Sequence, residues 1–117
     1  MLLFKKKFLD AIRDGTKTQT IRVWRTLRYR AGQRSYIPGV GYIRIESIEP
    51  VEVDQLTDAD ALPDGFASAA TLRAELAAIY ADPACAGGQA YRLRFRVLPT
   101  DEQAAAIAAR VARKTRP

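Results

Sequence analysis

The chain of 117 residues is 48% hydrophobic, which fits a single domain with its own core, and no apolar run is long enough to span a bilayer. It contains no histidine and one cysteine, Cys85, which excludes Ser-His-Asp catalysis, Cys-His catalysis and an internal disulfide and disfavours a zinc site. We therefore expect a cytoplasmic protein with no metal, no cofactor and no membrane partner. A monomer is favoured, but the sequence leaves the oligomeric state open.

The net charge of +6 is unevenly distributed along the chain. Residues 1–34 carry ten Lys and Arg against two acidic residues, and residues 83–117 carry seven against two. Between them, residues 45–82 carry nine acidic residues against one arginine. A fold that brings both basic ends together would present a positive face to a polyanion such as RNA, although a merely solvated basic surface is the alternative.

The first third of the chain alternates strand and helix patterns. Residues 1–4 are apolar and predict a short strand, and residues 5–14 place apolar side chains at helical spacing. Gly15 stands where a helix ends in the left-handed conformation that glycine adopts at little cost. Residues 16–24 are rich in β-branched side chains and predict a second strand, which is followed by a basic connection over residues 25–34.

The middle of the chain predicts strands and then an acidic connection. A short strand is expected over residues 33–38, ending at a Pro-Gly turn. Residues 42–53 predict a long strand whose alternation slips, which indicates a bulge or kink near residues 47–50. Residues 56–66 predict an acidic loop with a helical turn.

The last third predicts two helices on either side of the clearest strand. Ser68 is a helix cap, and the helix is expected to run to about Ala81, followed by a loop over residues 82–88. Residues 91–98 alternate apolar residues with arginines and predict a strand. Thr100 is expected to open a final helix, with Gln103 three residues later completing a capping box.

The predicted order is therefore β-α-β-β-β-α-β-α. Short strands joined by turns predict an α+β fold with a mostly antiparallel, barrel-like sheet and flanking helices, not a doubly wound parallel sheet. We assign residues 1–98 to the folded domain. Residues 99–117 are expected to form an Ala- and Arg-rich C-terminal helix or tail, which either frays or serves as an accessory arm.

The densest polar signal is the octad from Gly15 to Arg22. On an extended chain Thr18, Thr20 and Arg22 share one face, and the long side chain of Lys17 can swing toward it. A point charge, a planar guanidinium and short hydroxyl donors are what phosphate recognition requires. A solvated polar strand edge is the alternative explanation of the same spacing.

This octad resembles the G-x-K-x-x-T-x-R signature of ASCH domains, which belong to the PUA-like β-barrel superfamily. Further similarities follow in order as far as residue 98: Ala31-Gly32-Gln33, Leu56-Thr57, Asp64-Gly65-Phe66, the helix ending at Tyr80 and the strand from Tyr91 to Val97. The resemblance implies a PUA-like barrel whose cleft holds RNA or a nucleoside.

Our first hypothesis is a binding module in which RNA lies over the basic N-terminal third. A tyrosine flanked by two arginines, Tyr29, is a candidate for base stacking. The candidate RNA- or phosphate-binding residues are Lys17, Thr18, Arg22, Arg25, Arg28 and Tyr29.

The resemblance also implies two enzymatic alternatives. One branch of small bacterial ASCH proteins hydrolyses acetylcytidine, and by position its roles fall on Lys17 as base, Thr20 as nucleophile and Asp64 as acid. That branch has glutamate at the third position, and aspartate is one methylene shorter, so misplacement of its carboxyl group would reduce the rate. Such a mechanism also needs a lowered pKa for Lys17, which burial and Arg22 would favour and Asp64 would oppose. Ribonuclease activity is the further alternative.

A stripe of three arginines on the strand 91–98 is the second polar candidate. Arg92, Arg94 and Arg96 occupy one face of that strand. They are expected either to bind phosphate or to pair with the acidic segment 46–64.

Overall fold

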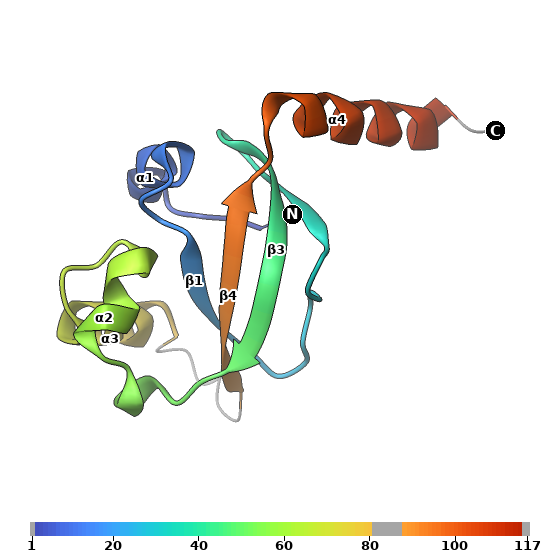
Figure 1. Cartoon of the computed structure of the whole chain (residues 1–117). Coiled ribbons are helices and arrows are strands. Elements are labelled where there is room, and N and C mark those ends of the chain that lie inside the picture. The colour runs from blue at the N-terminus through green and yellow to red at the C-terminus, as the bar shows by residue number, and fades with distance from the viewer. Residues whose placement is uncertain (1, 81–87, 116–117) are drawn as a thin grey trace.

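The computed structural model describes residues 2–80 and 88–115, and four of its strands form one antiparallel sheet (Figure 1). The strands are β1 (Gln19–Trp24), β2 (Arg34–Ile37), β3 (Gly41–Pro50) and β4 (Gln89–Val97), in the spatial order β1-β4-β3-β2. The sheet curls into a half-barrel, which confirms the α+β class and the antiparallel pairing. Cys85 and nearly all of the loop expected at 82–88 lie outside the described residues.

Helices flank the sheet at both ends. The 3-10 turn η1 (Lys6–Phe8) leads into α1 (Leu9–Asp14), and η2 (Val53–Gln55), α2 (Asp58–Ala61) and η3 (Leu62–Asp64) form the acidic connection. The remaining helices are α3 (Ala69–Ile79) and α4 (Thr100–Thr115). None of the described helices combines the length and the hydropathy that a membrane span requires.

Two helix boundaries follow the local signals in the sequence. Gly15 ends α1 with φ 85°, the left-handed conformation expected for it. The Ser68 side chain accepts a hydrogen bond from the Thr71 backbone N–H, and the Thr71 side chain accepts one from the Ser68 backbone N–H, so α3 begins with a capping box.

One local prediction is confirmed and two need correction. The bulge expected near residues 47–50 of β3 is present at the start of that region, where the register shifts between Ile45 and Ser47 and one extra residue is accommodated against β4. Residues 2–4, by contrast, form no strand: Leu2 is buried, but its N–H makes a single backbone hydrogen bond to the Tyr36 carbonyl, at 3.2 Å. Gln103 makes no capping box; its amide instead bonds both the N–H and the carbonyl of Tyr42, at 2.9 and 2.7 Å.

Two hydrophobic clusters hold the helices against the sheet. The first joins the sheet to the N-terminal segment and α1, and the second joins β1 and β4 to α2 and α3. The edge strand β1 therefore lies between α1 and the α2–α3 unit, and this arrangement positions the pocket described below. The first cluster contains Leu2, Ile12, Ile37, Ile43, Ile45, Leu93 and Phe95, and the second contains Ile21, Leu56, Ala61, Leu72, Leu76 and Ala90.

The last helix, α4, extends away from the body of the domain (Figure 1). Its first turns are anchored by Gln103 and by Ala106, which is buried. Farther along, Ile107 and Val111 are more than half exposed, so this helix adds little to the core.

Candidate functional site

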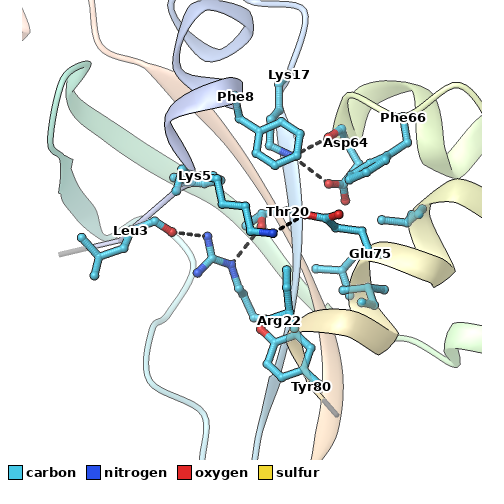
Figure 2. A pocket seen from close by; sticks show the side chains of 15 residues that line it. Leu3, Lys5, Phe8, Lys17, Thr20, Arg22, Asp64, Phe66, Glu75 and Tyr80 are labelled. Atoms are coloured by element: carbon cyan, nitrogen blue, oxygen red, sulfur yellow. Dashed lines mark hydrogen bonds and ion pairs between the residues drawn. The ribbon is translucent and has the colours of Figure 1, made fainter. Parts of the chain in front are cut away.

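A pocket of about 350 Å³ opens at the β1 edge of the sheet, between the N-terminal segment, β1 and α3 (Figure 2). Its volume lies in the range of small-molecule sites. Most of its walls are aromatic or aliphatic, and its polar groups are few. The lining residues are Leu3, Phe4, Lys5, Phe8, Lys17, Thr20, Ile21, Arg22, Asp64, Phe66, Leu72, Glu75, Leu76, Ile79 and Tyr80.

A buried ion pair forms part of the pocket wall. Lys17 Nζ donates to Asp64 Oδ1 at 2.7 Å and also to the Asp64 backbone carbonyl. Both residues are only 3% exposed. Gln19 donates to the second carboxylate oxygen at 3.2 Å, so the carboxylate has partners on both oxygens.

The backbone explains how Asp64 reaches Lys17 across 47 positions of sequence. The Thr18 N–H donates to the Pro63 carbonyl at 2.8 Å, which fixes the 3-10 turn η3 against the start of β1. Gly65 then reverses the chain with φ 89°. Because η3 lies directly against the start of β1, the Asp64 carboxylate contacts the Lys17 ammonium. The side chain of aspartate, although shorter than that of glutamate, therefore leaves no gap toward Lys17.

Three phenylalanines surround the ammonium of Lys17. Its Nζ lies 4.6 Å from the ring centroid of Phe8, 5.7 Å from that of Phe66 and 5.8 Å from that of Phe4. The rings of Phe8 and Phe66 also contact each other, with centroids 5.5 Å apart. The faces of aromatic rings attract a cation, so these rings take the place of water around a buried charge.

Opposing influences act on the pKa of Lys17. Burial lowers it most, and the charge of Arg22 lowers it further, whereas the charge and hydrogen bond of Asp64 raise it. The net result is a pKa below the ordinary lysine value. The neutral amine is therefore more accessible at Lys17 than at an exposed lysine.

Thr20 is the hydroxyl group of the pocket. It is 5% exposed, and its Oγ1 accepts a hydrogen bond from Arg22 Nε at 3.0 Å. Arg22 also donates to the Leu3 carbonyl at 2.7 Å and lies 4.7 Å from the ring centroid of Phe4, so its guanidinium is held in place. With that oxygen already accepting, the Thr20 O–H proton is available for a ligand or a base.

Charged residues border the pocket on the side of α3. Glu75 accepts a hydrogen bond from Lys5 at 2.8 Å and lies 3.4 Å from Lys7 Nζ. The hydrogen bond from Lys5, with the charges of both lysines, lowers the pKa of Glu75. These contacts link the N-terminal segment to α3 beside the pocket (Figure 2).

The structure brings together Lys17, Thr20, Arg22 and Asp64 from the predicted site. The other predicted residues do not line this pocket. Thr18 faces solvent, and Arg25 and Arg28 are exposed in the connection after β1. Tyr29 is half-buried against the first core cluster, with its ring centroid 5.7 Å from that of Trp24.

The three arginines of β4 were expected either to bind phosphate or to pair with the acidic segment 46–64, and they differ in their partners. Arg92 bonds Glu49 at 2.7 Å and Asp60 at 2.8 Å, so the predicted pairing with the acidic segment is confirmed for this residue. Arg94 is exposed. Arg96 lies 3.8 Å from Glu102, which belongs to α4 and not to the acidic segment.

Sequence reasoning missed the aromatic wall and the acidic residue of α3. In the sequence, Phe8 belongs to the apolar stripe of the helix predicted over residues 5–14, and Phe66 belongs to the Asp64-Gly65-Phe66 similarity; neither pattern predicts a pocket wall. Glu75 interrupts the apolar stripe of α3 one position before Leu76, a signal that could have identified it as facing a partner. Within the described ranges, no group of three or more Cys, Asp or Glu is placed to hold a metal ion.

Comparisons with known proteins support the fold alone. No family model matches the chain, and no curated protein matches it. A crystal structure of the hypothetical protein PH0355 is similar with a TM-score of 0.68 at 10% identity, over 82% of this chain and 95% of that one. A crystal structure of protein EF3133 from Enterococcus faecalis, described with DUF984, is similar with a TM-score of 0.65 at 16% identity, over 82% of this chain and 71% of that one. The chain thus shares a small α+β half-barrel fold with proteins whose names state no activity.

Proposed function

We propose that the pocket at the β1 edge binds a nucleoside or a single unstacked base of an RNA chain. The supporting observation is the combination of apolar, aromatic walls with the polar groups of Lys17, Thr20 and Arg22 on one side. A base has an apolar face and a polar edge, and such a pocket offers a surface to each. The volume of about 350 Å³ suits one nucleoside and excludes a folded RNA segment.

We also propose that the chain is an ASCH-type protein of the PUA-like superfamily. The octad from Gly15 to Arg22 matches the signature of that family at all four of its defined positions. The antiparallel half-barrel with flanking helices is compatible with such a domain. The C-terminal helix α4 lies outside the resemblance.

Hydrolysis of an acylated cytidine is the second candidate function. It is favoured by one observation: Lys17, with its lowered pKa, and Thr20, with its hydroxyl proton available, line the same pocket. In this proposal Lys17, as the neutral amine, accepts the Thr20 proton while Thr20 Oγ1 bonds to the acyl carbon. The amide C–N bond then breaks, and the leaving nitrogen receives that proton from Lys17. Water finally hydrolyses the threonyl ester, which releases acetate and restores Thr20.

Titration calorimetry with cytidine and acetylcytidine tests the binding proposal. Thr20→Val removes one hydrogen bond of about 1 kcal/mol, so we expect about fivefold weaker binding. Thr18→Val is the matched control, because Thr18 lies two residues away and does not line the pocket. Absence of binding to either nucleoside, or equal losses in both variants, would contradict the proposal.

Chromatography of the same mixtures separates the two candidates. Release of cytidine from acetylcytidine by the wild type and not by Thr20→Val supports the hydrolase. Binding without release supports a binding module. RNA cleavage remains a prediction from the sequence, since no contact in the described pocket favours it over binding.

A further inference from the structure

A row of arginines crosses the sheet toward the β2 edge, opposite the edge that carries the pocket. Arg34 of β2 pairs in register with Arg44 of β3, and Arg44 pairs in register with Arg96 of β4. Residues paired in this way project from the same face of the sheet, so the three guanidinium groups are neighbours. The adjacent residues Ile43 and Ile45 are fully buried, so the row faces away from the first core cluster.

The row contains more positive charge than the described residues neutralise. Like charges directly opposite one another destabilise a sheet. The nearest carboxylate, that of Glu102, lies 3.9 Å from Arg44 and 3.8 Å from Arg96. Within residues 2–80 and 88–114, the side chain of Arg34 makes no hydrogen bond or ion pair, and neither does that of Arg30 in the preceding loop.

Helix α4 adds arginines to the same region. Gln103, Ala106, Arg110 and Arg113 follow at spacings of three, four and three, so they share one helical face. Gln103 and Ala106 hold the beginning of this face against the sheet, whereas Ile107 and Val111 are exposed to solvent. A helix that packed on the sheet along its whole length would turn aliphatic residues inward, yet here arginines occupy those positions.

The result is a polar cavity of about 560 Å³ between α4 and the β2–β3 hairpin. Its lining contains four arginines and, among the described residues, no acidic side chain. We call this cavity the arginine groove, and it is lined by Arg30, Gly32, Gln33, Arg34, Tyr42, Arg44, Ala106 and Arg113.

Two tyrosines lie beside the charged row. Tyr36 and Tyr42 pair in register, with ring centroids 5.3 Å apart, and both are only half-buried. The guanidinium of Arg110 lies 5.8 Å from the ring centroid of Tyr36. Aromatic rings next to a positively charged groove are the arrangement with which proteins bind single-stranded nucleic acid.

We propose that the arginine groove binds the backbone of a single-stranded nucleic acid, with a base stacked on Tyr36. Phosphate groups would supply the negative charge that the row lacks, and guanidinium groups bind phosphate with two parallel hydrogen bonds. The groove and the pocket lie at opposite edges of the sheet. This inference therefore stands or falls independently of the function proposed for the pocket.

Fluorescence anisotropy with a labelled 12-nucleotide RNA of mixed sequence, measured over a salt series, tests the proposal. The groove variant is Arg30→Gln/Arg34→Gln/Arg113→Gln, chosen because these side chains make no hydrogen bond or ion pair with the described residues. A matched variant, Lys6→Gln/Arg13→Gln/Arg73→Gln, removes the same charge outside the groove and outside the candidate RNA-binding residues. We expect the groove variant alone to reduce the slope of log K against log salt by about 2, because each phosphate contact on a single strand contributes about 0.7.

Two further measurements separate loss of RNA binding from loss of folding and test the stacking of a base on Tyr36. The thermal midpoint of the groove variant should equal or exceed that of the wild type, since mutually repelling charges are removed. Tyr36→Leu should weaken binding to the RNA but not to inorganic polyphosphate, which has no bases. Equal losses in both triple variants, no RNA binding by the wild type, or equally effective competition by polyglutamate of similar length would each overturn the proposal.

Discussion

Lys17 and Asp64 form an ion pair at 2.7 Å in which both side chains are almost completely withdrawn from water. Removing two charges from water costs several kcal/mol for each ion, which only good geometry and further hydrogen bonds offset. Gln19 and the Asp64 carbonyl supply those bonds, and the phenylalanine rings face the ammonium. The pair therefore keeps a charged group inside a pocket whose walls are mostly apolar.

Removing one partner of this pair should destabilise the protein strongly. Lys17→Met leaves the Asp64 carboxylate buried without its cation, and we expect a loss of about 3–5 kcal/mol in the free energy of unfolding. The double variant Lys17→Met/Asp64→Leu should recover most of that loss, because no uncompensated charge remains. Urea denaturation of Lys17→Met, Asp64→Leu and the double variant gives the coupling energy between the two residues. Additive losses in the free energy of unfolding would contradict a direct interaction between the buried charges.

The lowered pKa of Lys17 predicts how stability depends on pH. Its pKa in the folded protein lies below 10.5, so the unfolded chain binds more protons at this residue between the two pKa values. The free energy of unfolding should therefore rise with pH through that interval. Subtracting the values for Lys17→Met/Asp64→Leu removes the contribution of other lysines and tyrosines. If the difference in the free energy of unfolding between the two proteins falls with rising pH, the charge and hydrogen bond of Asp64 raise the pKa of Lys17 by more than burial lowers it.

The guanidinium of Arg22 should matter for its geometry as well as its charge. Arg22→Lys keeps the positive charge but removes the Nε–H that bonds Thr20 and the second bond to the Leu3 carbonyl. We expect about tenfold weaker binding of cytidine, measured by calorimetry, because Thr20 and the cation are no longer held in place to bind the ligand, at a cost of about 1 kcal/mol for each ligand hydrogen bond that is weakened. If Arg22→Lys binds cytidine as tightly as the wild type, the positive charge at this position is sufficient for binding and the guanidinium geometry is not required.

Gln103 should determine whether α4 stays on the sheet. Gln103→Leu removes the bonds to Tyr42 and to the Leu98 carbonyl and takes from the Tyr42 N–H its side-chain acceptor, at a cost of about 1–3 kcal/mol. Hydrogen exchange in α4 should then accelerate more than in β4. Ile107→Ala is the control, because that side chain is half exposed, and it should leave exchange elsewhere in α4 unchanged. Equal protection of α4 in Gln103→Leu and wild type would disprove this role.

Features with a local cause could be predicted from the sequence. The left-handed glycine at position 15, the cap at Ser68 and the strand around Phe95 follow from side chains within a few residues of one another. The shared face of Thr20 and Arg22 in the octad could also be predicted, because alternate residues of a strand project to the same side. The antiparallel class followed from short strands joined by turns.

Contacts between distant segments were decided only by the tertiary structure. The hydrogen bond from Thr18 to the Pro63 carbonyl brings Asp64 to Lys17, and no local pattern encodes that distance. Strand register likewise aligned Arg34 with Arg44 and Arg96, a row that appears nowhere in the linear sequence. The physical reason is that backbone geometry fixes the direction of a side chain within its element, whereas the burial of apolar surface by the whole chain fixes which elements meet.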